Sequence, residues 1–243
     1  MIPLSSQVLV PGEELLYEVS FLGIKLGSIR VVNEGKQNYN GIEVYKTKAY
    51  MDSYRGIPFV DLHSSYESWI DPSSVFSYKF EGNTKQSNEG WDFERIKFNY
   101  NDGKINFEKW FNKKLFESGE VKSSKKMNDG LSLFYTARQL LKVNKYVKIP
   151  TFMVKDTCFT YINFTGKVEN VEIDAVNYPV RTVYFSGKAD WTGVYGVTGQ
   201  FEGWFSDDDA RIPILAKMKV YVGNADIKLI KWKHNGWQPP KGN

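Results

Sequence analysis

Three consecutive aspartates form the densest group of metal-binding side chains in the 243-residue sequence. They stand in the stretch EGWFSDDDARIPIL, and carboxylate oxygens are the ligands that Ca²⁺ prefers. Recognisable calcium loops alternate their ligands and end on a later acidic residue, whereas Asp207 to Asp209 are adjacent and an Ala-Arg step follows. We therefore predict a turn between two strands. One aspartate accepts backbone N–H bonds, one pairs with Arg211, one is solvated, and Pro213 begins the next strand.

The remaining side chains offer little for catalysis. The sequence has two histidines, His63 and His234, and one cysteine, Cys158, so zinc has no convincing ligand set. A nucleophilic triad would have to use His63, which alternation places on a strand beside polar neighbours. Neither a Walker loop nor a dinucleotide-binding glycine motif is present. We predict no catalytic, metal-binding or cofactor-binding residue. A hydrolase with paired carboxylates remains an alternative, because 28 acidic residues provide many pairs and no spacing selects one.

Charge and hydropathy narrow the class of partner. The formal net charge is +4, and the one denser lysine cluster, residues 109–126, also carries Glu117 and Glu120. Nucleic-acid binding usually requires a stronger stripe of one sign, so we expect no nucleic-acid partner. No run of eighteen apolar residues exists, so no transmembrane segment is predicted, and peripheral membrane contact is left open.

Alternating apolar and polar residues dominate the chain, which is the pattern of half-buried strands. In LLYEVSF, Leu15, Tyr17 and Val19 share one face. Turn signals such as Asn40-Gly41 follow one another at short spacing, which favours antiparallel hairpins over parallel crossovers. We predict an all-β, mainly antiparallel protein of about 12 to 15 strands.

One segment departs from this pattern. NDGLSLFYTARQLLK has apolar residues at helical spacing, with Asn128 or Asp129 available to cap the start. A helix that is apolar around most of its circumference is usually buried. We therefore predict a strongly curved sheet, or an open or half barrel, wrapped around one buried helix at about residues 129–142.

Arg138 is the unusual residue of this helix, because a buried guanidinium needs a carboxylate partner. It either meets Asp207, Asp208 or Glu67, or reaches solvent. The candidate polar cluster comprises Arg138, Asp129, Asp207, Asp208, Arg211 and Glu67.

The domain organisation is simple. We expect residues 1–10 to form a flexible N-terminal end, residues 11–233 a single β-rich domain, and residues 234–243 an irregular C-terminal tail. The first fifteen residues, MIPLSSQVLVPGEEL, look like the start of a mature domain.

Four stretches of the sequence follow one another in the order of the motifs of a known family. They are PGEELLYEVSFLGIKLGSIRV, DLHSSYESWIDPSSVFSYKF, NDGLSLFYTARQLL and GWFSDDDARIPILAKMKVYVGNADIKL. This succession resembles an exported bacterial family, domain of unknown function 3108. The matching residues are Gly12, Glu13, Tyr17, Gly23, Gly27, Tyr66, Asp71, Asp129, Ser132, Tyr135, Arg138, Asp208, Arg211 and Pro213. The resemblance implies export to the periplasm or cell envelope, and it implies no catalytic residue because the function of the family is not established.

Aromatic residues make up 16% of the sequence, and several strands are apolar on both faces. We therefore expect non-enzymatic binding of a hydrophobic ligand, such as a lipid, an acyl chain or a lipidated partner, in the curved sheet. The candidate groove aromatics are Phe134, Tyr135, Tyr17, Phe159 and Tyr161. The alternative is a structural module that docks another envelope protein. The sequence does not indicate the oligomeric state.

Overall fold

The computed structural model describes residues 8–57, 61–86, 90–153, 155–192, 198–220 and 223–243. The first group of strands is β1 (Glu14–Phe21), β2 (Ile24–Tyr39), β3 (Ile42–Ser53), β4 (Leu62–Ile70), β5 (Ser77–Gln86), β6 (Gly90–Asn99), β7 (Lys104–Phe111) and β8 (Lys114–Lys122). Helix α2 (Gly130–Leu140) follows. The second group is β9 (Tyr146–Met153), β10 (Asp156–Val171), β11 (Val180–Thr192), β12 (Thr198–Ser206), β13 (Pro213–Lys219) and β14 (Asn224–Lys233).

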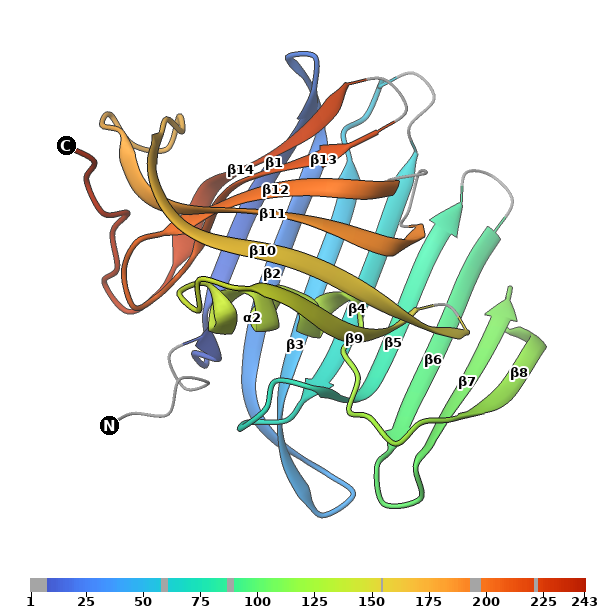
Figure 1. The fold of residues 1–243 in the computed structure, drawn as a ribbon. Coiled ribbons are helices and arrows are strands. Elements are labelled where there is room, and N and C mark those ends of the chain that lie inside the picture. Colours follow the sequence, from blue (N-terminus) through green and yellow to red (C-terminus); the bar gives the residue numbers. More distant parts are fainter. Residues whose placement is uncertain (1–7, 58–60, 87–89, 154, 193–197, 221–222) are drawn as a thin grey trace.

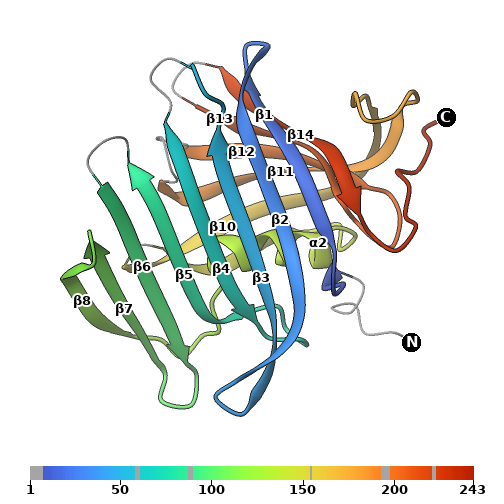
Figure 2. The ribbon, with the colours of Figure 1, turned by 180° about the vertical axis from the view of Figure 1, so that it is seen from behind.

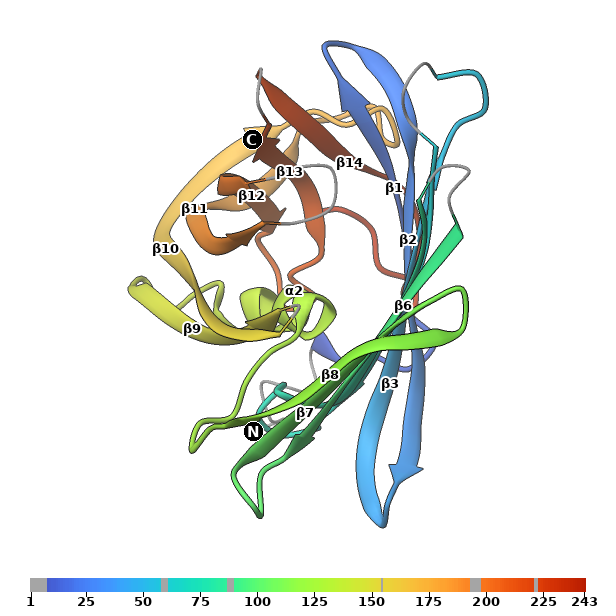
Figure 3. The same cartoon turned by 90° about the vertical axis from the view of Figure 1, so that its right-hand side faces the viewer.

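All fourteen strands belong to one antiparallel sheet with the order β8-β7-β6-β5-β4-β3-β2-β1-β14-β13-β12-β11-β10-β9. Each group is a meander, and the two meanders join where β1 pairs with β14. The sheet curves so that the meanders face each other, and α2 lies between them (Figures 1 and 3). In the described part of the chain β8 and β9 remain the two edges, so the curved sheet is not closed. The predicted all-β class, strand number and buried helix are confirmed.

Local sequence explains the strands and their turns. In β10, Ile162 and Phe164 are each 1% exposed, whereas Asn163 between them faces solvent. β2 and β3 are joined by the two residues Asn40 and Gly41, with φ angles of 51° and 84°. Two successive positive φ angles are what a type I′ hairpin turn requires, and an Asn-Gly pair adopts them readily.

Helix α2 separates two hydrophobic clusters. Leu131 and Tyr135 pack into the larger cluster, to which strands of both meanders contribute, whereas Ala137 and Leu141 pack against β9 to β12. The helix therefore contributes side chains to both halves of the core, as its apolar circumference predicted. No helix of the described residues has the length and apolarity needed to cross a membrane.

Both ends of the domain are packed. The flexible segment predicted for residues 1–10 falls largely on residues 1–7, which lie outside the described residues, while Val8 and Leu9 are buried. The C-terminal tail, residues 234–243, has an irregular backbone and is attached at several points. The amide of Arg181, at the start of β11, donates to the carbonyl of Pro240, and the amide of Gly242 donates to the carbonyl of Pro179, just before β11.

Close packing in the second meander gives a testable prediction. Gly203 of β12 lies opposite Phe185, and a Cβ added to Gly203 would overlap the phenyl ring. Gly203→Ala should therefore lower the free energy of unfolding by about 1–3 kcal/mol, the usual cost of overpacking. Gly130→Ala is the control, because its Cβ would lie an ordinary 3.6 Å from Met153 and alanine favours helices. Urea unfolding measures both changes, and equal effects of the two variants would contradict this account of the packing.

Candidate functional site

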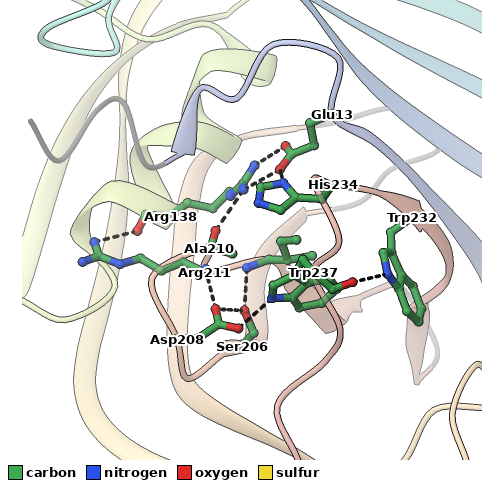
Figure 4. Close-up of polar contacts among 10 residues, drawn as sticks. Glu13, Arg138, Ser206, Asp208, Ala210, Arg211, Trp232, His234 and Trp237 are labelled. Carbon is green, nitrogen blue, oxygen red and sulfur yellow. Dashed lines mark hydrogen bonds and ion pairs between the residues drawn. The ribbon is translucent and has the colours of Figure 1, made fainter. Parts of the chain in front are cut away.

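A buried ion pair joins α2 to the start of the sheet. Arg138 is 0% exposed and Glu13, directly before β1, is 2% exposed. Arg138 Nη1 donates to Glu13 Oε1 at 2.6 Å and Nη2 donates to Oε2 at 2.9 Å, which is a bidentate geometry (Figure 4). Two further groups complete the site: Arg138 Nη2 donates to the carbonyl of Ala210 at 2.9 Å, and His234 Nδ1 lies 2.8 Å from Glu13 Oε2.

Both members of this pair are ionised. Burial alone would raise the pKa of Glu13, but the charge of Arg138 and the hydrogen bond with His234 lower it below its ordinary value. Burial alone would lower the pKa of Arg138, and the charge of Glu13 raises it instead. A pair whose pKa values diverge in this way holds its charges at neutral pH and does not exchange protons. The arrangement is therefore suited to fixing the helix, not to acid–base chemistry.

The predicted partners of Arg138 are wrong. Asp207 pairs with Arg181 at 2.9 Å and Lys142 at 3.2 Å, while Glu67 faces away from the helix on β4. Asp208 is also occupied by other donors. The actual partner, Glu13, lies 125 residues from Arg138 in the sequence. No local pattern could connect the two.

The three aspartates form the predicted turn between β12 and β13. Asp208 Oδ1 accepts from the Arg211 amide at 3.1 Å and from Ser206 Oγ at 2.8 Å. Its second oxygen accepts from Trp237 Nε1 at 2.7 Å, which attaches the C-terminal tail to the turn (Figure 4). β13 begins at Pro213, as predicted. No group of three or more metal-ligating side chains is assembled among the described residues.

Arg211 has a different role from the predicted pairing with an aspartate side chain of the turn. Its backbone is left-handed, with φ of 49°, and its Nη1 donates to the carbonyls of Arg138 at 3.2 Å and Gln139 at 2.8 Å. These carbonyls belong to the last turn of α2, where a cation compensates the negative end of the helix dipole. The turn therefore holds the C-terminal end of the helix.

Asp129 holds the other end. Its Oδ1 accepts from the amides of Leu131 at 2.8 Å and Ser132 at 2.7 Å, so it caps α2 as predicted. Its Oδ2 accepts from the hydroxyls of Ser68 on β4 and Ser77 on β5. Burial raises the pKa of Asp129, and the four hydrogen bonds oppose that shift without cancelling it. Asp129 therefore ties the start of the helix to the first meander.

The aromatic residues predicted to line a ligand groove lie in two places. Tyr17 and Tyr135 are buried beside the helix, and Phe134 packs partly against the same cluster. Phe159 and Tyr161 lie on β10, where Lys148 stands 3.6 Å above the Phe159 ring. The structure does not bring these five side chains into one groove.

A groove of about 890 Å³ lies elsewhere, over β4 to β7. These strands present it on the face of the first meander that points away from α2; Figure 2 shows the ribbon from that side. Cross-strand register aligns two rows of side chains there. The first row is Ser65, Asn83, Phe93 and Trp110. The second row is Glu67, Glu81, Arg95 and Glu108.

Trp91 lies at the rim of this groove and is 42% exposed. Its backbone exchanges hydrogen bonds with Asn112, which fixes the rim. Sequence reasoning missed the groove, although one signal was present: the alternation in GWDFERIKF places Trp91, Phe93 and Arg95 on the same strand face.

Ion pairs line the floor of the groove. Arg95 Nε donates to Glu81 Oε1 at 2.7 Å, and the guanidinium lies over the Phe93 and Trp110 rings at 5.4 Å and 5.2 Å. Glu67 bridges two lysines of β3 at 2.7 Å and 3.3 Å. Burial would raise the pKa of Glu67, but these lysines lower it overall. The groove therefore combines aromatic rings with carboxylates that are paired with cations.

The buried ion pair gives a prediction with a neighbouring control. Glu13→Gln should lower the free energy of unfolding by about 3–5 kcal/mol at pH 7, because it leaves the Arg138 guanidinium buried without a counter-charge. Glu14→Gln removes an ion pair with Arg30 that is 3.4 Å long and 43% exposed on each side. Glu14→Gln should therefore lower the free energy of unfolding by less than about 1 kcal/mol.

The same pair predicts a pH dependence. Because the folded-state pKa of Glu13 lies below its ordinary value, its stabilising contribution is complete above the unfolded-state pKa and is lost as the pH falls through the folded-state value. Urea titrations at several pH values measure the free energy of unfolding of the wild type and of Glu13→Gln. The difference between these two free energies should shrink below about pH 4. A difference that stays constant down to about pH 2 would contradict the assignment.

Comparison with known proteins adds a family and a fold. No curated protein sequence matches the chain. A crystal structure described as a β-barrel-like protein of domain of unknown function DUF1849 from Brucella abortus superimposes with a TM-score of 0.59. The match covers 93% of this chain and 98% of the other at 13% identity, so it supports the fold alone. The model of the family described as "Protein of unknown function (DUF3108)" matches residues 16–230. The chain therefore belongs to the DUF3108 family.

Proposed function

We propose that this protein is a non-catalytic binding protein of the bacterial periplasm or cell envelope, and that its ligand lies in the groove over β4 to β7. One observation carries the proposal: exposed and half-buried aromatic rings stand beside ordered polar groups in a groove of about 890 Å³. Ligand sites are typically concave, mostly apolar and furnished with a few fixed polar groups. Export rests on the family resemblance described above.

The space beside α2 is a less suitable site for the hydrophobic ligand that the sequence predicted. Tyr135, Leu141 and Phe152 are all 0% exposed there, so the core is already occupied by side chains. A lipid or acyl chain in this position would have to displace the helix. Displacement of the helix would separate Glu13 from Arg138, and each charge would then be unpaired in the core or exposed to solvent. The outer groove, in contrast, presents its aromatic rings without any rearrangement.

The carboxylates of the groove favour binding over hydrolysis. Glu67 and Glu81 lie directly opposite each other on β4 and β5, and a glycosidase also uses two facing carboxyl groups. Such a pair needs one carboxylic acid with a raised pKa, whereas both of these groups contact cations and the pKa of Glu67 is lowered. Burial raises the pKa of Glu94 to about 7, but strand alternation places Glu94 on the opposite face of β6 from Phe93 and Arg95.

The indole N–H resonances of the seven tryptophans provide the test. The folded chain is titrated with the aqueous and the organic-solvent extracts of bacterial envelopes. At least one extract should shift the Trp91 and Trp110 resonances and leave Trp237, which reports on the Glu13–Arg138 region, unchanged. Shifts centred on Trp232 and Trp237 would place the ligand beside the helix, and no shift with either extract would contradict a binding function.

A further inference from the structure

We infer that the groove over β4 to β7 binds an uncharged carbohydrate, with Trp91 as the stacking platform. The inference rests on the proposed function and assigns it a ligand class. A sugar ring has an apolar C–H face and an edge of hydroxyl groups. A site for it therefore needs a flat exposed aromatic ring next to hydrogen-bonding groups of both kinds.

The aromatic part of the groove meets the first requirement. Trp91 is 42% exposed, and large aromatic rings contribute an apolar body with a polar tip. Phe93 and Trp110 pack together with their centroids 5.0 Å apart at 53°, which gives the groove a rigid wall beside Trp91. This wall needs no ordering when a ligand binds, so little conformational entropy is lost.

The polar part meets the second requirement. Asn83 and Ser65 lie side by side in the row that continues from Phe93 and Trp110. An amide offers both donors and acceptors, as does a hydroxyl. Among the described residues, neither side chain is engaged in a hydrogen bond, so both are available to the hydroxyls of a sugar. The carboxylates of Glu67 and Glu81 supply additional acceptors in the next row.

The charges of the groove argue against other ligand classes. Arg95 already covers the Phe93 and Trp110 rings, so these rings are not free to form a cage for a cation. An anion would meet the Glu67 and Glu81 carboxylates. An acyl chain laid along the floor would remove water from the Arg95–Glu81 ion pair without replacing its hydrogen bonds, which is costly. An uncharged ligand rich in hydroxyl groups avoids all three penalties.

The experiment titrates soluble cellotetraose, chitotetraose and maltotetraose into the full chain, followed by calorimetry and by the tryptophan indole resonances. At least one oligosaccharide should bind and shift the Trp91 resonance. Trp91→Ala should weaken that binding at least tenfold, and Asn83→Ala should also weaken it. Tyr146→Ala is the matched control, because Tyr146 is a more exposed aromatic residue, at 67%, on a different strand, β9. It should leave the affinity unchanged.

The outcomes separate this inference from the proposed function. If no oligosaccharide binds while an envelope extract still shifts Trp91 and Trp110, the carbohydrate assignment is overturned and the groove remains a binding site. If neither binds, both fail. Binding that is unaffected by Trp91→Ala and Asn83→Ala would place the sugar elsewhere and overturn the inference. Thermal unfolding of each variant verifies that it is folded.

Discussion

The Glu13–Arg138 ion pair is the contact on which the arrangement of the two meanders depends. It is fully desolvated, bidentate, and supported by the Ala210 carbonyl and by His234. These groups come from the N-terminal end, the helix, the turn before β13 and the C-terminal end. A buried charge pair does not by itself guarantee stability, because desolvation opposes the Coulomb attraction. Its geometry does specify one position for the helix, since any shift leaves a buried charge unpaired.

Separate polar groups hold the two ends of helix α2. Asp129 and its serine partners fix the first turn to β4 and β5, while Arg211 fixes the last turn to the β12–β13 connection. The inner face of the sheet is thereby committed to packing around α2. The binding function that we propose is therefore assigned to the outer face, where β4 to β7 present tryptophan, phenylalanine and charged side chains that the core does not use.

The sequence predicts those structural features that depend only on residues close together in the chain. Alternation in β1 and β10, the Asn40-Gly41 turn and the apolar circumference of α2 are local patterns, and Asp129 could be recognised as a cap from its position alone. The partner of Arg138 could not be predicted in this way. Glu13 reaches it only because β1 pairs with β14 and the sheet curves around the helix. The groove was missed for the same reason, because its rows form only when four strands align in register. The prolines and glycines of the tail predict an irregular backbone, but they give no sign of the hydrogen bond from Trp237 to Asp208.

Hydrogen exchange of the α2 backbone amides tests most directly whether the helix is a fixed part of the core. Amides in the middle of Gly130–Leu140 should exchange only through global unfolding, with the same free energy as the central amides of β1 and β14, whether or not a ligand is present. Exchange of the helix at a free energy several kcal/mol below that of β1 and β14 would show that α2 leaves the sheet in the native state. That result would contradict the assignment of the inner face to packing and of the outer face to binding.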